Sequence, residues 1–176
     1  MSETAEKCSS EGQWEMRGPT TSFLKRSRLI TTDTMPFIAT TTLPHMTVVP
    51  KCLKSLQKKG VKTGVLSNKP DEFVDKMLKK AFPNHKFTQA WGQKPQYKTK
   101  PEPDALLALL NMSGVTPEEC FYVGDSDVDV FTANNAGVKM AGVSWGFRGK
   151  NELMNAGAPF VADTTEELFD YICKFI

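Results

Sequence analysis

Three aspartates stand at alternate positions in the stretch YVGDSDVDV (122–130), directly after residues suited to a buried strand. Asp125 and Asp129 are four positions apart, so their carboxylates can converge on one side of a helix, whereas Asp127 points elsewhere. Two converging carboxylates at a strand end suit an octahedral Mg²⁺ that keeps several waters and meets a substrate phosphate. The pattern therefore predicts that Asp125 and Asp129 are the two carboxylates on the side of the site that faces the metal.

The same stretch has two other interpretations. The spacing D-x-D-x-D begins an EF-hand calcium loop, but Val130 stands where that loop needs glycine and Ala136 where it needs a bidentate glutamate. A solvated helix cap, with Asp127 at the N-cap and Asp129 favoured by the helix dipole, explains Asp127 well. It explains Asp125 poorly, because that residue directly follows a glycine at the mouth of a strand. We expect Asp127 to act only as a cap.

Polar residues also follow the predicted strand 61–66. Ser67 and Asn68 come directly after it, and the predicted helix behind them offers unpaired backbone N–H groups at its N-terminus. A hydroxyl, an amide and a helix N-terminus together make a cradle for a phosphate group. The alternative is that the two side chains merely cap that helix.

A lysine-rich loop, GQKPQYKTKPEPD, precedes the predicted helix 103–112. Its lysines are Lys94, Lys98 and Lys100, and prolines at 101 and 103 stiffen the backbone after the last of them. A lysine held rigidly can supply a point charge to a phosphoryl group or to a carboxylate. The alternative is a solvated basic loop.

Elements that could position these residues alternate from Val48 onward. Apolar spacing and Pro or Gly stop signals predict helices at 50–59, 70–82, 103–112 and 127–137, strands at 61–66, 86–91, 120–123 and 139–145, and a closing helix, strand and helix. This alternation indicates an α/β fold, a Rossmann-like three-layer α/β/α domain with a parallel sheet and right-handed crossovers. Ligands of such sheets lie beyond the carboxyl ends of the strands.

The first part of the chain has a different composition. Residues 1–47 are rich in serine and threonine, and within them only 28–33 (RLITTD) could form a short strand. We expect 1–47 to be disordered or loosely attached and 48–176 to form the core domain.

Bulk composition excludes several classes of protein. A net charge of +2 gives no reason to expect nucleic acid or an anionic membrane as partner. The four cysteines form no CxxC, which argues against a zinc site or a disulfide framework. No apolar run approaches the roughly 18–20 residues that cross a bilayer, and the first twenty residues are too acidic for a signal or transit peptide. We expect a cytoplasmic protein.

Three of these stretches together resemble a known family. SNKP at 67–70, KPEPD at 100–104 and YVGDSDVDVFTANNAG at 122–137 are similar to the second, third and fourth motifs of the haloacid dehalogenase (HAD) superfamily. The nearest branch is the phosphoglycolate phosphatases, and the resemblance covers roughly 48–172. It implies a Mg²⁺-dependent phosphomonoester hydrolase that acts on a small phosphorylated metabolite through an aspartyl-phosphate.

The resemblance also implies a role for each matched residue. Ser67 and Asn68 would bind the phosphoryl oxygens. Lys100 would neutralise the nucleophile and the phosphoryl group and so belongs to both the catalytic and the phosphate-binding set. Asp125 would bind Mg²⁺ directly, and Asp129 would help to position the ion or its waters.

The family's first motif, DxDGT, which carries the nucleophile and the general acid, is absent. The nearest stretch is LITTDTMPF (29–37), in which Asp33 could align with the nucleophile, but Met35 and Pro36 replace the second aspartate and the glycine. The alternative is a threonine-rich loop that contains an aspartate by chance. The fourteen residues between Asp33 and Val48 are too few for the helical cap of this branch.

Several hypotheses follow from that departure. The chain is either a phosphatase of this type, or a catalytically inactive HAD-like remnant that binds phosphate, Mg²⁺ or a partner chain. A receiver-like phosphoacceptor domain shares the fold class, but it needs an acidic pair after the first strand, which this chain lacks. The central strand could be lost together with the first motif, which would leave the HAD-like core incomplete.

Overall fold

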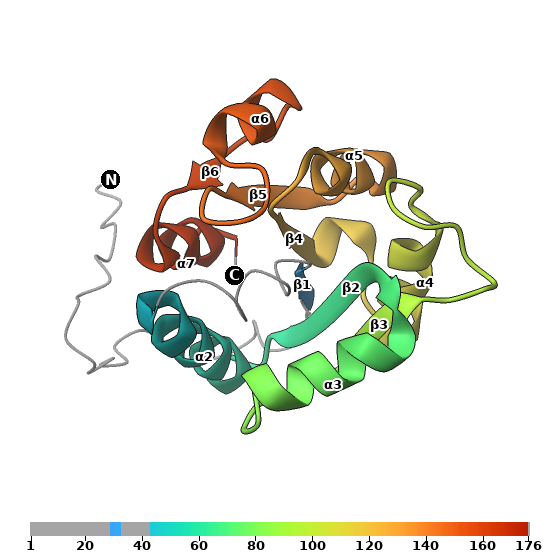
Figure 1. Cartoon of the computed structure of the whole chain (residues 1–176), viewed down its shortest axis with the longest axis horizontal. Coiled ribbons are helices and arrows are strands. Elements are labelled where there is room, and N and C mark those ends of the chain that lie inside the picture. The colour runs from blue at the N-terminus through green and yellow to red at the C-terminus, as the bar shows by residue number, and fades with distance from the viewer. Residues whose placement is uncertain (1–28, 33–42, 176) are drawn as a thin grey trace, which may run out of the picture.

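In the part of the chain that the structure describes, six short segments form the strands of one sheet, and every pair of neighbours runs parallel (Figure 1). The structure is a computed structural model that describes residues 29–32 and 43–175. Its strands are β1 (Leu29–Thr32), β2 (Lys62–Pro70), β3 (Gln89–Gln93), β4 (Cys120–Gly124), β5 (Lys139–Val143) and β6 (Val161–Ala162). Their order across the sheet is β3-β2-β1-β4-β5-β6.

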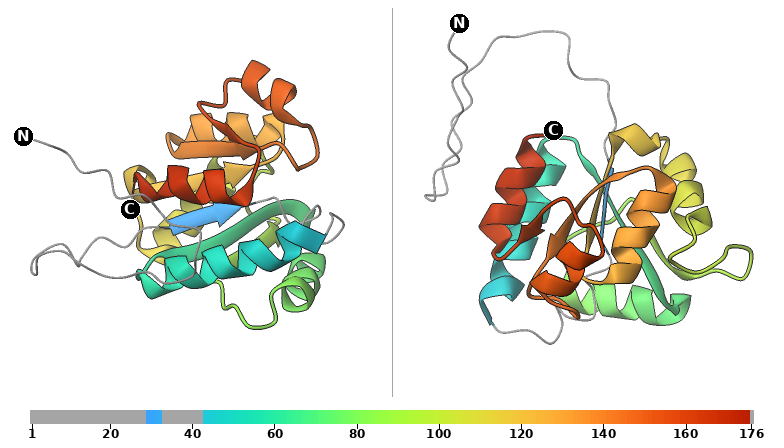
Figure 2. Two further views of the ribbon diagram at one scale, coloured as in Figure 1. Left: turned by 90° about the vertical axis from the view of Figure 1, so that its left-hand side faces the viewer. Right: turned by 90° about the horizontal axis from the view of Figure 1, so that it is seen from above.

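Helices cover both faces of the sheet (Figure 2). One face is packed by α2 (Leu43–Lys58), α3 (Asp71–Ala81) and α7 (Thr165–Cys173), and the other by α4 (Asp104–Ser113), α5 (Asp127–Ala136) and α6 (Lys150–Asn155). A short 3-10 helix, η1 (Pro117–Glu119), leads into β4. The predicted three-layer α/β/α fold with a parallel sheet is confirmed.

Strand β4 shows why an uninterrupted apolar run marks a strand of this kind. Cys120 and Tyr122 lie in the core between the sheet and helices α4 to α6, while Phe121 and Val123 lie in the core beneath α2 and α7. Because the side chains alternate between two covered faces, every position of the strand must be compatible with burial. All five residues of β4 are buried.

Strand β1 lies in the middle of the sheet and pairs with both β2 and β4. Thr32 is aligned with Val65 on one side and with Val123 on the other. The expected boundary at residue 47 is therefore wrong for 29–32, and also for 43–47, which belong to α2. The central strand is present. Its threonines favour extended backbone through their branched Cβ atoms, but they interrupt the apolar pattern that marks the other strands.

Helix boundaries agree with the sequence at glycines and disagree at a proline. Helices α4 and α5 end at Gly114 and Gly137, which adopt left-handed φ values of 63° and 67° as C-caps. Helix α2, in contrast, does not begin at Pro50 but contains it. A proline inside a helix removes one backbone hydrogen bond without necessarily ending the helix, so its position alone could not identify the first turn.

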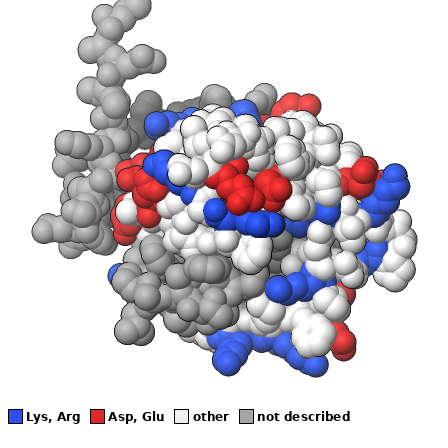
Figure 3. Space-filling view, turned by 45° about the horizontal axis from the view of Figure 1, so that its top comes forward, with Lys and Arg blue, Asp and Glu red and all other residues white. Residues whose placement is uncertain are grey.

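The described part of the chain contains no helix that is both long and apolar enough to cross a membrane. On the face seen in Figure 3, acidic and basic side chains lie close to one another among uncharged ones.

Candidate active site at the switch point of the sheet

The order of the strands fixes where the candidate site lies. From β1 the chain builds β2 and β3 on one side, whereas β4, β5 and β6 lie on the other, so the order reverses between β1 and β4. Open α/β sheets bind ligands at such a switch point, outside the carboxyl ends of the strands. The predicted site residues in the irregular end of β2 and directly after β4 lie at this edge.

An ion pair buried from solvent lies at this edge. The ammonium nitrogen of Lys100 is 2.7 Å from Oδ1 of Asp129, and the two side chains are 2% and 0% exposed. The hydroxyl of Tyr122 donates to the same carboxylate oxygen at 3.0 Å and lies 3.4 Å from the Lys100 nitrogen. Lys100 is therefore not part of a solvated basic loop. Its charge is held at the switch point by one strand and one helix.

Asp129 accepts hydrogen bonds from five donors. Besides the two at Oδ1, its Oδ2 accepts from the main-chain N–H of Asp125 at 3.1 Å, and from the N–H and hydroxyl of Ser126 at 3.1 and 2.7 Å. Burial alone would raise the pKa of Asp129. The charge of Lys100 and the hydrogen bonds from Lys100, Ser126 and Tyr122 outweigh burial and hold that pKa below its usual value. Asp129 is therefore a carboxylate whose oxygens already bind protein donors.

Asp125 is buried at the end of β4 beneath the turn that follows β5. Its Oδ2 accepts from the N–H of Phe147 at 3.1 Å, and its carbonyl oxygen accepts from the N–H of Arg148 at 3.2 Å. A Cβ added to Gly146 would lie only 2.0 Å from the Cβ of Asp125. Only glycine at 146 therefore lets this turn close over the carboxylate.

Ser126, not Asp127, caps helix α5. The Ser126 hydroxyl accepts from the N–H of Asp129, and the Asp129 side chain accepts in return from the N–H of Ser126. The prediction of Asp127 as N-cap is wrong, because Asp127 is already the first helical residue and the N-cap position falls on Ser126. Asp127 is the first residue of α5 and is only partly exposed, and among the described residues its Oδ1 is buried without a hydrogen-bond partner.

Ser67 and Asn68 lie in an irregular end of β2, where the pairing with β3 shifts between Leu66 and Pro70. Neither side chain caps α3, whose N-cap is Pro70 without a side-chain hydrogen bond. Ser67 is buried, and its hydroxyl accepts from the N–H of Lys69 at 3.3 Å. Asn68 forms two hydrogen bonds with the backbone of Lys100. Its predicted contact with phosphoryl oxygens remains a prediction.

The other lysines of the loop before α4 lie elsewhere. Lys94 pairs with Asp71 at 2.6 Å, and Asp71 also accepts from the N–H of Gly92 at 2.8 Å. Lys98 is exposed. The ion pair and the N–H bond fix the start of the loop to the first turn of α3. The candidate nucleophile, Asp33, lies outside the described residues, directly after the last residue of β1.

Two residues of the site were not expected from the sequence. In the sequence, Tyr122 fits the apolar pattern of the strand, and only its hydroxyl group indicates that the side chain needs a polar partner. Ser126 carries a signal that could have been used, because Ser-x-x-Asp before a helix is close to the capping-box pattern. Both act on Asp129.

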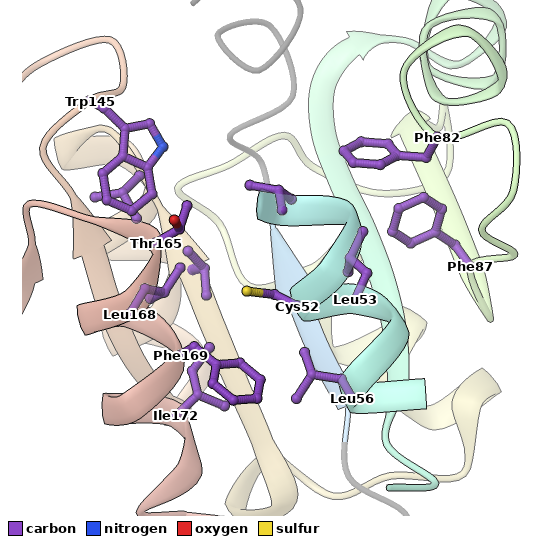
Figure 4. Close-up of a pocket in the computed structure, with 13 residues that line it drawn as sticks. Cys52, Leu53, Leu56, Phe82, Phe87, Trp145, Thr165, Leu168, Phe169 and Ile172 are labelled. Carbon is purple, nitrogen blue, oxygen red and sulfur yellow. The ribbon is translucent and has the colours of Figure 1, made fainter. Parts of the chain in front are cut away.

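A separate cavity of about 70 Å³ lies between α2, α7 and the sheet (Figure 4). Side chains of Cys52, Leu56, Leu168 and Phe169 point into it from the two helices, and Trp145 closes one end. Its lining is apolar apart from Thr165. No Asp, Glu, His, Lys or Arg lines it, in contrast to the switch point.

Comparison with known proteins agrees with this arrangement. Residues 25–143 match the family model of haloacid dehalogenase-like hydrolases, so the match includes β1, the candidate nucleophile position and the segment from Ser67 to Asp129, but not the turn at 146–148. The fold is that of an α/β protein with a parallel sheet, and the chain belongs to the haloacid dehalogenase-like hydrolase family.

Individual relatives point to one branch of that family. The chain is 36% identical over 118 residues to a protein of Pseudomonas putida named probable phosphoglycolate phosphatase, an alignment that covers 67% of this chain and 44% of the relative. A solved structure from Lactobacillus delbrueckii is 38% identical with a TM-score of 0.67, covering 70% of this chain and 52% of that chain. A predicted phosphoglycolate phosphatase from Haemophilus somnus is 28% identical with a TM-score of 0.63, covering 73% and 55%. The chain thus spans about half the length of the relatives it matches.

Proposed function

We propose that this chain is a Mg²⁺-dependent phosphomonoester hydrolase of phosphoglycolate phosphatase type, acting on a small phosphorylated metabolite. The observation that carries the proposal is the solvent-excluded pair of Lys100 and Asp129 at the switch point of the sheet. A lysine fixed in this way supplies positive charge at the edge of the sheet that also carries Ser67, in the irregular part of β2, and Asp125, directly after β4. The names of the relatives support the choice of branch.

Ser67 and Lys100 are the proposed ligands of the phosphoryl oxygens. Both are buried, at 4% and 5% exposure, so a phosphate bound between them would be shielded from water on that side. Donors that are already oriented in a site of low dielectric constant stabilise developing charge more than they would in water. This arrangement favours an anion that accepts several hydrogen bonds over a neutral substrate.

Magnesium fits the donor set of the site. Asp125 is a buried carboxylate, and the described residues contain no cluster of three or more His, Cys, Asp or Glu side chains that could hold a metal. Mg²⁺ is usually bound through one or two carboxylates, substrate phosphate and several waters. Bound there, Mg²⁺ would neutralise charge on the phosphoryl group. Since Asp129 already accepts from five donors, we assign it to positioning the main chain of Asp125 and the ammonium of Lys100.

Asp33 is the proposed nucleophile, because it directly follows β1 in the sequence. Its carboxylate oxygen would bond to phosphorus as the bond to the substrate's alcohol oxygen breaks. Water would then hydrolyse the aspartyl-phosphate, releasing phosphate and restoring Asp33. Met35 replaces the family's second aspartate, so the proton for the leaving oxygen must come from water, and we expect slow turnover.

A second candidate function is phosphate or Mg²⁺ binding without hydrolysis. The replacement of the family's second aspartate and glycine by Met35 and Pro36 favours it. This candidate predicts that phosphate and Mg²⁺ raise the melting temperature of the protein although no ester is hydrolysed.

Phosphate release by the purified full-length chain distinguishes the two functions. The substrates are phosphoglycolate and other small phosphate esters, with Mg²⁺ or with EDTA. We expect Mg²⁺-dependent release that Asp33→Asn abolishes and that Asp75→Asn, at an exposed ion pair on α3, leaves unchanged. Stabilisation by phosphate and Mg²⁺ without release would establish the binding function instead. If the folded protein shows neither phosphate release nor stabilisation, both functions are contradicted.

A further inference from the structure

We propose that Asn68 is a positioning residue that places Lys100, and that its side chain acts through the lysine backbone instead of binding the phosphoryl group. The inference rests on the proposed function, because it concerns how the phosphate-binding lysine is held. It assigns Asn68 a role different from the one that the family resemblance implies.

The geometry consists of two hydrogen bonds between one side chain and one residue. The amide nitrogen of Asn68 donates to the carbonyl oxygen of Lys100 at 3.0 Å, and the N–H of Lys100 donates to the amide oxygen of Asn68 at 2.9 Å. The direction of the amide is determined by these partners, because a backbone N–H can only donate and a carbonyl can only accept. The side chain thus pairs with Lys100 as a neighbouring strand would.

The backbone beside Lys100 needs such an anchor. Pro101 follows and has no N–H to donate, and the turn here is closed by a bond from the N–H of Glu102 to the carbonyl of Thr99. A lysine also carries a long, flexible stem, so its ammonium group is placed only as well as its Cα is placed. Asn68 supplies both a donor and an acceptor at that Cα.

The far end of the lysine shows what this anchoring achieves. Its ammonium is buried against Asp129 and Tyr122, residues of α5 and β4, while its backbone is held from the end of β2. The two attachments lie on opposite sides of the switch point between β1 and β4. Asn68 therefore fixes the backbone end of Lys100, while the ammonium end is fixed on the other side of the site.

The same contacts limit any direct role of Asn68 toward substrate. Its amide oxygen is an acceptor and would repel a phosphoryl oxygen, and its amide nitrogen already donates one bond to Lys100. Ser67, which is buried beside it, has a hydroxyl that can turn toward an anion. We infer that Ser67 binds the phosphoryl group and that Asn68 positions the lysine.

The first test measures the position of Lys100 without using activity. Amine acylation of the folded chain is followed by mass spectrometry, comparing Lys100 with the exposed Lys98 two residues earlier as an internal control. We expect Asn68→Ala to raise the acylation rate of Lys100 about tenfold, the effect of losing two ordinary hydrogen bonds. The acylation rate of Lys98 should not change in this variant. Asn84→Ala, at the opposite end of the sheet, is the matched control and should leave the rate of Lys100 unchanged. An unchanged Lys100 rate would overturn the proposal.

The second test asks whether Asn68 acts through the lysine. Inorganic phosphate binding is measured by calorimetry for the wild type and Asn68→Ala, and again for both in a background carrying Lys100→Met with Asp129→Asn. The paired background removes both buried charges together, so no unpaired charge is left to unfold the chain. We expect Asn68→Ala to weaken phosphate binding about tenfold in the wild type and less than about twofold in that background.

The outcomes separate this proposal from the proposed function. An equal loss in both backgrounds would make Asn68 a direct phosphate ligand and overturn the positioning role. A wild type that binds no phosphate would contradict the proposed function, while the acylation rates would still decide whether Asn68 places Lys100. Melting temperatures of all variants show whether a change in acylation reflects local loosening of the lysine or loss of the fold.

Discussion

Lys100 and Asp129 lie 2.7 Å apart with essentially no solvent exposure, and this one pair joins the loop before α4 to the first turn of α5. Each member compensates the charge that the other brings into the protein interior. The pair therefore links the stability of the fold to the chemistry of the site, because the group that neutralises Asp129 is the group proposed to bind phosphate.

Removing one member of the pair should destabilise the protein strongly. Lys100→Met leaves the Asp129 carboxylate buried without its counter-charge, and we expect a loss of about 3–5 kcal/mol in the free energy of unfolding, measured by urea denaturation. Lys100→Met combined with Asp129→Asn should cost less than Lys100→Met alone. The expectation is contradicted if the double variant is the less stable of the two.

The response to acid should depend on Asp129. Its pKa is lowered in the folded state, against the effect of burial, by the charge of Lys100 and the hydrogen bonds that it accepts. Its contribution to stability is therefore complete above the unfolded value of about 3.9 and is lost as pH falls through the folded pKa. Asp129→Asn should lower stability near neutral pH and flatten its fall in acid. Urea midpoints across this range test it, and parallel curves for variant and wild type would refute it.

Gly146 should matter for activity, and Gly60 for stability alone. Alanine at 146 would place its Cβ 2.0 Å from the Cβ of Asp125, so the turn over the metal-side carboxylate has to open. We expect Gly146→Ala to lose at least about tenfold in Mg²⁺-dependent phosphate release, since a shift of about 1 Å at a site can cost that much or more. Gly60→Ala meets no atoms but has a φ of +73°, and it should cost about 1 kcal/mol without loss of activity. Equal activities of the two variants would count against the role of this turn.

Restoring an acid at position 35 should accelerate hydrolysis. The family's second aspartate is replaced by Met35, and a positioned general acid typically contributes about 10²–10⁴-fold. We expect Met35→Asp to raise the rate at least about tenfold, with a rate that falls as pH rises above the pKa of the new acid. Met35→Asn is the matched control, because asparagine is similar in size to aspartate but carries no acidic proton. If both variants behave like the wild type, the alignment of Asp33 with the nucleophile loses its support.

The alternation of strands and helices was predictable because each element carries its own period and stop signals. The buried run of β4 and the glycine caps of α4 and α5 are local features of this kind. A short strand was expected as a possibility at 28–33, but its place in the middle of the sheet was not, because that place depends on partners far along the chain.

The candidate site could be proposed from the sequence as a set of residues but not as a set of contacts. Ser67, Lys100 and Asp125 were proposed from their places near strand ends or before a helix. Which lysine of the loop becomes buried, and which acceptor it meets, depends on the packing of α4 and α5 against β4. The role of Asn68 likewise depends on a residue 32 positions away.

The place of β1 has a consequence for synthesis. The four residues of β1 leave the ribosome before either partner, and β4 follows only after β2, α3, β3 and α4 have been made. Until then one edge of the growing sheet has no partner, and open edges recruit strands from other chains. We therefore expect the yield of folded protein to depend on how soon β4 follows β1 during translation, and to rise when chaperones shield the nascent chain.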